Sequence, residues 1–164
     1  KNKKLFIDKS ISTKGITYNN IKNIESELGI IDDILILSPL QSGMYFHALA
    51  EENDRAYFWQ YSYKIYNKIN IDLYNKAFTI LIKRHQVLRT VFRANVINQP
   101  VQIVLTNPKV DFRYLDLSNH SIDTQKSRII DLNQSDLEEV FDIDHGPLIR
   151  AVIYVKTFLK IRLI

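Results

Sequence analysis

The spacing of apolar residues divides the chain into short helices and strands. Apolar positions at helical spacing follow Thr17, which suits an N-cap, and Gly29 is a natural end for that helix. A second helix is expected to begin at Ser38, with Pro39 in its first turn and Gln41 completing a capping box. In both cases a side chain is available to satisfy the free N–H groups of the first turn.

Residues 57–66 alternate aromatic and polar side chains, which predicts a strand whose aromatic side chains lie in the core. Asp72 is expected to cap the next helix, with Leu73 and Ile80 on its buried face and Ile82 widening that face. Another helix is expected over 121–139. A short apolar segment covers 30–37, and strands are expected at 88–92, 101–105, 110–115 and 148–155, the last of them buried.

Helices interleaved with hairpin-connected strands predict a mixed fold class, α/β of the α+β kind. The 164 residues suffice for one domain, or for one lobe of a larger domain. With 46% apolar and 24% charged residues, the composition is that of a soluble globular protein. The absence of Cys excludes a disulfide scaffold, a thiolate nucleophile and a Cys-based zinc site.

Lys and Arg number 22 against 18 Asp and Glu, giving a net charge of +4. The cations form small groups rather than a stripe with interleaved aromatic residues, so we expect no nucleic-acid partner. No stretch approaches the roughly 18 apolar residues of a membrane span, and the first apolar run is too short for a signal peptide. We therefore expect a cytoplasmic protein with no membrane partner. Because Met44 is the only Met, we interpret the sequence as part of a longer chain.

Three segments carry recognisable motifs. The first motif, residues 37–47, is LSPLQSGMYFH; the second, 84–92, is RHQVLRTVF; the third, 141–150, is FDIDHGPLIR. The most specific of them is the second, in which an Arg-His pair precedes Leu-Arg-Thr. Its residue chemistry favours a helix end followed by a strand, with Arg89 paired to a carboxylate.

Together with Pro100 and Gln102 in a P-x-Q strand, these motifs resemble the condensation domains of nonribosomal peptide synthetases. The resemblance runs from about residue 31 to residue 150. It implies a chloramphenicol acetyltransferase-like lobe, with helices packed on a mixed β-sheet, that meets a second lobe around a tunnel. In that family the amine of a carrier-bound aminoacyl thioester attacks a carrier-bound donor thioester and forms an amide.

The resemblance also implies an organisation and a set of partners. Residues 1–30 would be a linker and lead-in helix after an upstream carrier domain, and residues 31–164 an incomplete N-terminal lobe. The partners would be peptidyl carrier domains bearing 4′-phosphopantetheine, adenylation domains and the missing C-terminal lobe. The chain itself would hold no cofactor and no metal.

The family's catalytic motif, His-His-x-x-x-Asp-Gly, has no counterpart, because the sequence holds neither a His-His nor an Asp-Gly pair. No catalytic residue is therefore assigned. If the family's partner of Arg89 is the Asp of that motif, we expect Arg89 to be solvated or to find another acid. The four histidines, His47, His85, His120 and His145, are expected in surface or packing roles. The matching motif residues are interpreted as structural: Ser38, Gln41, Gly43, Met44, Arg84, His85, Arg89, Thr90, Gly146, Pro147 and Arg150.

Two other functions stay open at this point. One is a coenzyme A-dependent acyltransferase of the acetyltransferase type, and the other a non-catalytic module that docks a carrier protein. Hydrolase, nucleotide-binding and zinc-protease functions are not supported, since no G-x-S-x-G, Walker, G-x-G-x-x-G or H-E-x-x-H sequence occurs. The leading expectation is an inactive part of a condensation domain whose parent makes peptide antibiotics.

Overall fold

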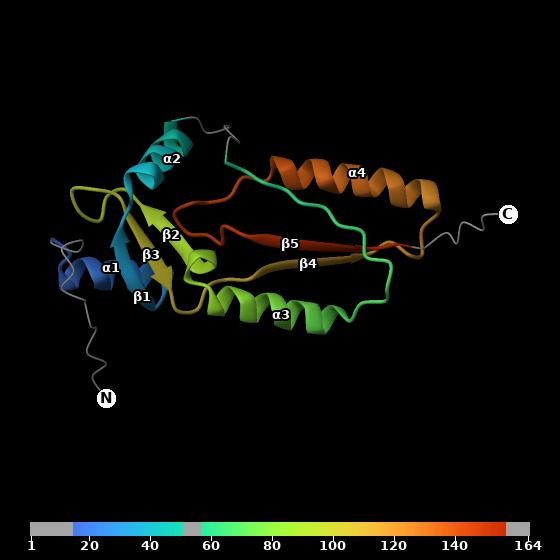
Figure 1. Cartoon of the computed structure of the whole chain (residues 1–164), viewed down its shortest axis with the longest axis horizontal. Helices are drawn as coiled ribbons and strands as arrows, with labels where there is room; N and C mark the ends of the chain where they lie inside the picture. The colour runs from blue at the N-terminus through green and yellow to red at the C-terminus, as the bar shows by residue number, and fades with distance from the viewer. Residues whose placement is uncertain (1–14, 51–56, 157–164) are drawn as a thin grey trace.

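The computed structural model describes residues 15–50 and 57–156 (Figure 1). Much of the linker expected in residues 1–30 lies outside the described residues. Helices and strands are both present and interleaved along the chain, which confirms the mixed fold class. No helix in the described ranges has the length and apolar character to cross a membrane. In chain order the elements are α1 (Tyr18–Leu28), β1 (Ile31–Ile36), α2 (Pro39–Ala50), α3 (Ile71–Arg84), the 3₁₀ helix η2 (Gln86–Arg89), β2 (Thr90–Arg93), β3 (Val101–Leu105), β4 (Asp111–Asp116), α4 (Ile122–Glu138) and β5 (Arg150–Val155).

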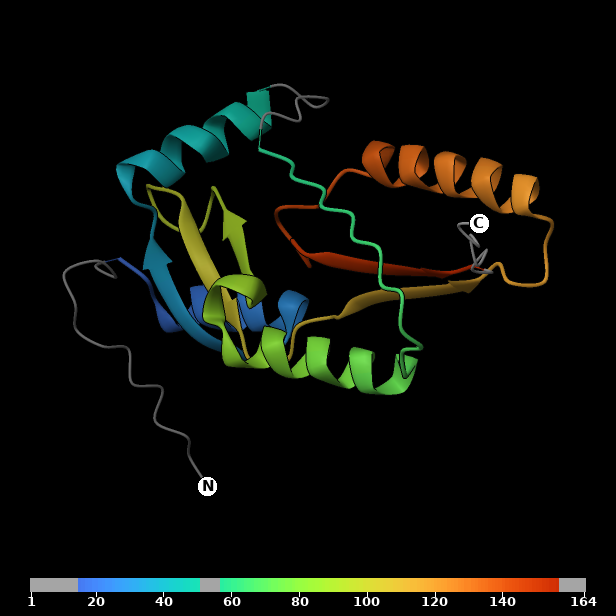
Figure 2. The ribbon, with the colours of Figure 1, turned by 45° about the vertical axis from the view of Figure 1, so that its right-hand side comes forward.

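The strands β1, β3 and β2 form an antiparallel sheet with β3 at its centre. Figure 2 shows α1 lying behind this sheet. Ile21 and Ile24 of α1 are buried in one cluster with Val101 and Ile103 of β3. Alternate residues of a strand point to the same face, so Val101 and Ile103 both meet the helix. This apolar contact is the main core of the described structure.

The strands β4 and β5 form a separate parallel pair. In Figure 1 this pair lies between α3 on one side and α4 on the other. A parallel pair needs a long crossover, and α4 supplies it. Phe78 of α3 contacts Phe112 of β4, with ring centroids 6.2 Å apart. The prediction that β5 is buried is wrong: it is half-buried along its whole length, because only β4 pairs with it among the described strands.

The predicted first helix start is confirmed by its hydrogen bonds. The Thr17 hydroxyl accepts from the Asn20 amide at 3.2 Å, and the Asn20 side-chain oxygen accepts from the Thr17 amide at 2.8 Å. Ser121 likewise caps α4, its hydroxyl accepting from the Thr124 amide at 3.3 Å. These local bonds satisfy donors that the helix leaves free, which is why the sequence alone located the Thr17 cap. The Ser121 cap was not predicted, although a helix over 121–139 was.

The predicted cap of α3 is wrong by two residues. Asn70 is the N-cap, and its side-chain oxygen accepts from the Leu73 amide at 3.0 Å, while Asp72 lies in the first turn. The expected buried face is also wrong, since Leu73 is 61% and Ile80 63% exposed. The helix instead packs through Ile82, which was expected at the edge of that face and is fully buried.

The strand predicted over 57–66 is not formed. These residues carry no assigned strand, and Trp59, Tyr61 and Tyr63 are 75%, 70% and 82% exposed rather than in the core. Alternation describes how side chains would divide between two faces, but a strand also needs a neighbour for its N–H and C=O groups. No described strand pairs with this segment, which Figure 1 shows in green crossing toward α3.

Residues 141–147 run beside β2 and connect the three-stranded sheet with the parallel pair of β4 and β5. The Phe92 amide of β2 donates to the Ile143 carbonyl at 2.9 Å. Gly146 has φ of +64°, a conformation that favours glycine. A Cβ built at Gly146 would lie 2.9 Å from Cγ1 of Val91, which is almost fully buried. Gly146 is therefore required both by its backbone conformation and by its close approach to β2.

We predict that Gly146→Ala lowers the free energy of unfolding by about 1–3 kcal/mol, because the added methyl group is strained at positive φ and meets Val91. Denaturant unfolding followed by circular dichroism measures this. Gly43→Ala is the matched control. Its Cβ would meet nothing within 4 Å in α2, so the change should be neutral or stabilise by up to ~1 kcal/mol. Equal effects of the two changes would contradict the prediction.

Candidate functional site

The three motifs meet at one place in the structure. We call this contact the motif junction and define it by Tyr45, Phe92, Ile143 and Asp144. Besides the bond from Phe92 to Ile143, the Tyr45 hydroxyl donates to the Asp144 carboxylate at 3.4 Å. The Tyr45 and Phe92 rings lie 6.1 Å apart. Burial, and then the charge of Asp144, raise the pKa of Tyr45, so its hydroxyl remains a donor to Asp144 at neutral pH.

The start of the first motif is the predicted capping box. The Ser38 amide donates to the Gln41 side-chain oxygen at 2.9 Å, and the Gln41 amide donates to the Ser38 hydroxyl at 3.3 Å. The Gln41 side chain also donates to Gln102 of β3 at 3.3 Å. It therefore ties α2 to the P-x-Q strand. Gly43 and Met44 lie on the exposed side of α2.

The second motif divides between a helix end and a strand, as predicted. Arg84 ends α3, and His85 follows it; both are exposed. The hydroxyl of the buried Thr90 donates to the Gln86 carbonyl at 2.8 Å, closing the η2 turn onto β2. The polar groups of this motif thus point to several different neighbours rather than into one pocket.

Arg89 finds an acid from another part of the chain. Its Nη1 donates to Asp32 at 2.6 Å and to the Leu105 carbonyl. The register between β1 and β3 shifts at Asp32, and such a bulge redirects a side chain. The Thr106 hydroxyl donates to the same carboxylate at 2.8 Å. The Arg89 side chain is only 10% exposed, and its buried Nε has no hydrogen-bond partner among the described residues.

The third motif ends in a second ionic cluster. Gly146 and Pro147 form the turn beside β2, and Arg150 begins β5. The side chain of Arg150 is 6% exposed and lies between carboxylates from two other elements, at 3.0 Å from Asp111 of β4 and 2.8 Å from Asp136 of α4. Arg150 thereby holds the crossover helix against the parallel pair.

Arg113 and Glu139 extend this cluster. Burial opposes ionisation of Asp111, but hydrogen bonds from Arg113 and Arg150 outweigh it and lower the pKa of Asp111. The hydrogen bond from Arg113 also lowers the pKa of Glu139. The hydrogen bonds that Arg113 donates to Glu139 and then to Asp111 raise the pKa of its own guanidinium. All these groups are therefore charged at neutral pH, and stabilise one another.

His145 is the residue that sequence reasoning missed. Only a surface or packing role was expected for it, yet its ring nitrogens each lie 2.8 Å from a carboxylate oxygen, one of Asp142 and one of Glu27. Asp142 precedes His145 by three residues, so a local turn could have suggested that contact. Glu27 comes from α1, and no sequence pattern predicts it. His47, in contrast, has the packing role expected of it, since its ring lies edge-on against that of Tyr57, 5.8 Å away.

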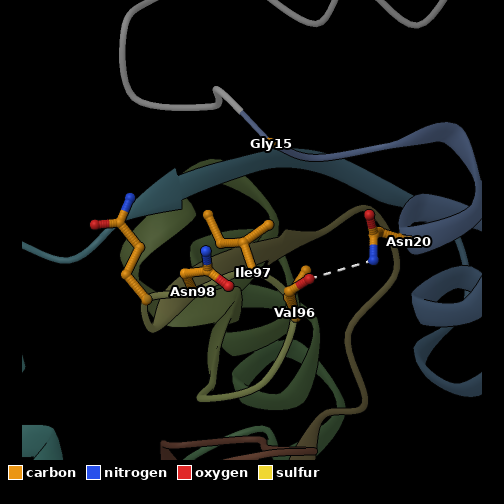
Figure 3. A pocket seen from close by; sticks show the side chains of 6 residues that line it. Gly15, Asn20, Val96, Ile97 and Asn98 are labelled. Carbon is orange, nitrogen blue, oxygen red and sulfur yellow. Dashed lines mark hydrogen bonds between the residues drawn. The ribbon is translucent and has the colours of Figure 1, made fainter.

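Two hollows open near α1. The larger, about 420 Å³, is lined by residues of α1, α2 and β2, among them Tyr45 and Arg93, and by Asp144 of the third motif. The smaller hollow, about 390 Å³, lies by Gly15 and the turn after β2. Figure 3 shows Asn20, which lines this hollow, with its side-chain amide donating a hydrogen bond to the Val96 carbonyl. No group of three or more His, Asp or Glu side chains among residues 15–50 and 57–156 is arranged to hold a metal ion.

Residues 31–158 match the family model described as Condensation domain. The chain is 35% identical over 124 residues to Gramicidin S synthase 2 of Brevibacillus brevis, and 31% identical over 121 residues to Bacitracin synthase 3 of Bacillus licheniformis. These matches cover 76% and 74% of this chain but only 3% and 2% of the relatives, so the chain spans a small part of their length. A crystal structure of the epimerization domain from the third module of tyrocidine synthetase B is 27% identical, with a TM-score of 0.46 over 54% of this chain and 20% of that chain.

We predict that Asp32→Asn lowers the free energy of unfolding by about 1–3 kcal/mol, because it leaves the nearly buried Arg89 cation without its carboxylate. Thermal or urea unfolding measures the change. Asp123→Asn is the matched control, since Asp123 and Lys126 are 3.5 Å apart with side chains 95% and 71% exposed. That control should stay within about 0.5 kcal/mol of the parent chain. A silent Asp32→Asn would contradict the account of Arg89.

We predict that Arg150→Lys lowers the free energy of unfolding at pH 7 by about 1–3 kcal/mol, because an ammonium cannot reach both carboxylates in the geometry of a guanidinium. The lowered pKa values of Asp111 and Glu139 give stability that is present above pH ~4 and lost as the pH falls through their folded values.

The difference between the parent chain and Arg150→Lys should therefore shrink toward pH 3. Urea unfolding at pH 7, 5 and 3 measures it. Arg128→Lys on the exposed side of α4 is the control and should leave the curve unchanged. A difference that is constant from pH 7 to pH 3 would rule out the ionic explanation.

Proposed function

The chain belongs to the condensation-domain family, and we propose that it supplies the N-terminal lobe of a domain whose parent protein joins two carrier-bound building blocks through an amide bond. In this proposal residues 31–164 belong to the lobe, and residues 1–30 connect it to an upstream carrier domain. Membership of the family supports the chloramphenicol acetyltransferase-like fold that the motifs led us to expect.

The motif junction is the observation that supports the proposal most directly. Three segments separated by tens of residues each resemble a family motif, and each contributes a side chain or backbone group to the same contact. A chance resemblance in one segment would give no reason for the three to touch. The capping box and the two arginine clusters then hold the surrounding elements in place.

The proposed reaction is the aminolysis of a thioester. The amine nitrogen of the acceptor aminoacyl thioester attacks the carbonyl carbon of the donor thioester. The C–N bond forms, the C–S bond breaks, the amine loses a proton, and the donor carrier keeps a free thiol on its phosphopantetheine arm. The arm belongs to the carrier, so it is part of the substrate and no residue of this chain is assigned to hold it.

We propose that these 164 residues do not catalyse this reaction alone. A catalytic His would orient the amine or take up its proton, which contributes typically about 10²- to 10⁴-fold. The sequence has no His-His-x-x-x-Asp-Gly. His145, whose ring contacts two carboxylates, has both ring nitrogens occupied by them. No hydroxyl or amine nucleophile is paired with it among the described contacts.

The partners proposed are carrier domains bearing 4′-phosphopantetheine, an adenylation domain and a second lobe, all in the cytoplasm. The relatives whose names are synthases of gramicidin S, tyrocidine and bacitracin support a peptide-antibiotic pathway as the setting. We propose that the surface for a carrier includes α2 or residues 57–66, since these hold most of the exposed aromatic side chains among the described residues.

The test is to supply the catalytic His motif and the second lobe from a relative. A chimera would join residues 1–155 to the following part of a condensation domain from Gramicidin S synthase 2, and would be offered donor and acceptor carriers loaded with amino acids. We predict dipeptidyl thioester, detected by mass spectrometry, from the chimera and none from the chain alone. Replacing the supplied catalytic His by Ala should reduce the rate about 10²- to 10⁴-fold.

The controls separate this proposal from the two alternatives. Acyl transfer from a coenzyme A thioester to a free amine, with no reaction on carriers, would favour the acetyltransferase function. Tight carrier binding by a folded chimera without product would favour a docking module. Product formed by the 164-residue chain itself would contradict the claim that it lacks the catalytic group.

A further inference from the structure

His145 links two segments that lie far apart in the sequence. Its Nδ1 is 2.8 Å from Asp142 in the third motif, and its Nε2 is 2.8 Å from Glu27 on α1. The side chains of His145 and Glu27 are 49% and 50% exposed, so solvent protons reach the imidazole. We call the contact of Glu27, His145 and Asp142 the imidazole bridge.

The number of protons on the ring decides whether both bonds can exist. A neutral imidazole has one N–H donor and one acceptor, whereas an imidazolium has two donors. Ionised carboxylates only accept hydrogen bonds. Both contacts of the imidazole bridge are therefore satisfied only when His145 is protonated.

Every element packed around the bridge contributes to its charge. Arg93 of β2 donates to the same Glu27 oxygen at 2.7 Å and opposes a second cation nearby. Asp144 adds a further carboxylate in the third motif, and Tyr45 of α2 donates to it. The hydrogen bonds that His145 makes to Glu27 and then to Asp142 dominate and raise the pKa of His145. The hydrogen bonds that Glu27 accepts from Arg93 and then from His145 lower the pKa of Glu27.

We propose that His145 is a protonation-dependent latch that fastens α1 to the third motif. When the ring loses a proton, the bond that remains is the one to Asp142. The Asp142 carboxylate is fixed in the turn, because it also accepts from the backbone amides of Asp144 and His145. Glu27 has Arg93 as a second partner, so it is the contact on α1 that is lost.

Loss of the latch loosens α1 without releasing it. Ile21 and Ile24 stay buried against the sheet, and the Asn20 side chain still donates to the Val96 carbonyl at 3.2 Å. A histidine whose pKa is raised on folding stabilises the contact below its unfolded value, near pH 6.5, and this stability is lost as the pH rises through the folded value. Since α1 precedes residues 31–158, the latch couples the preceding chain to the third motif. It does not depend on the proposed function.

Hydrogen exchange of backbone amides tests the latch in the full chain. Protection of the α1 amides, corrected for the intrinsic pH dependence of exchange, is compared between pH 5.5 and pH 8.5. The amide of Ile103 in β3 serves as internal reference. We expect α1 protection to fall about two- to fivefold across this range, the size of one partly exposed ion pair, while protection at Ile103 stays constant.

His145→Gln keeps one donor and cannot be charged, so it should abolish the pH-dependent fall in α1 protection. Glu27→Gln, on the exposed side of α1, should abolish it as well and provides a second variant should His145→Gln fail to fold. His120→Gln is the matched control and should behave like the parent chain. The proposal is overturned if α1 protection in the parent chain does not change between the two pH values, or if His145→Gln or Glu27→Gln leaves the fall intact.

Discussion

The hydrogen bond from the Phe92 amide to the Ile143 carbonyl is the contact on which the arrangement of the site depends. It fixes residues 141–147 beside β2, where Gly146 can approach Val91 and Asp144 can receive the Tyr45 hydroxyl. An edge strand offers free backbone groups, and here an irregular segment uses one of them. This contact joins the three-stranded sheet to the segment that leads from α4 into β5.

Charged groups then hold the elements that the apolar core does not reach. The core lies between α1 and the three-stranded sheet, whereas the parallel pair carries few fully buried side chains. Arg150 and Arg113 connect β4, β5 and α4 through carboxylates, and Arg89 connects η2 to the β1 bulge. A buried cation is costly unless it is paired, so each arginine restricts how its neighbours can move. Two of the three motif arginines, Arg89 and Arg150, each bridge two or more elements, which agrees with the structural role that the family resemblance implied for them.

The sequence predicted local features well. The N-cap at Thr17, the capping box at Ser38 and the extent of β3 depend on residues close together in the chain, and their patterns are specific. Features set by distant partners were missed or wrong. The alternation of residues 57–66 could not reveal that no described strand lies beside them, and nothing near His145 in the sequence indicated Glu27. The motifs told us which segments matter, but only the structure showed that Tyr45, Phe92 and Asp144 share one contact.

The central claim is that the three motifs converge, and the Phe92 amide reports on it directly. In an isotope-labelled chain, nuclear magnetic resonance can detect the scalar coupling across the hydrogen bond between the Phe92 nitrogen and the Ile143 carbonyl carbon. The account predicts this coupling, together with slow exchange of the Phe92 amide and a ring-to-ring contact between Phe92 and Tyr45. A rapidly exchanging Phe92 amide with no coupling to Ile143, in a chain whose β3 amides are protected, would contradict it.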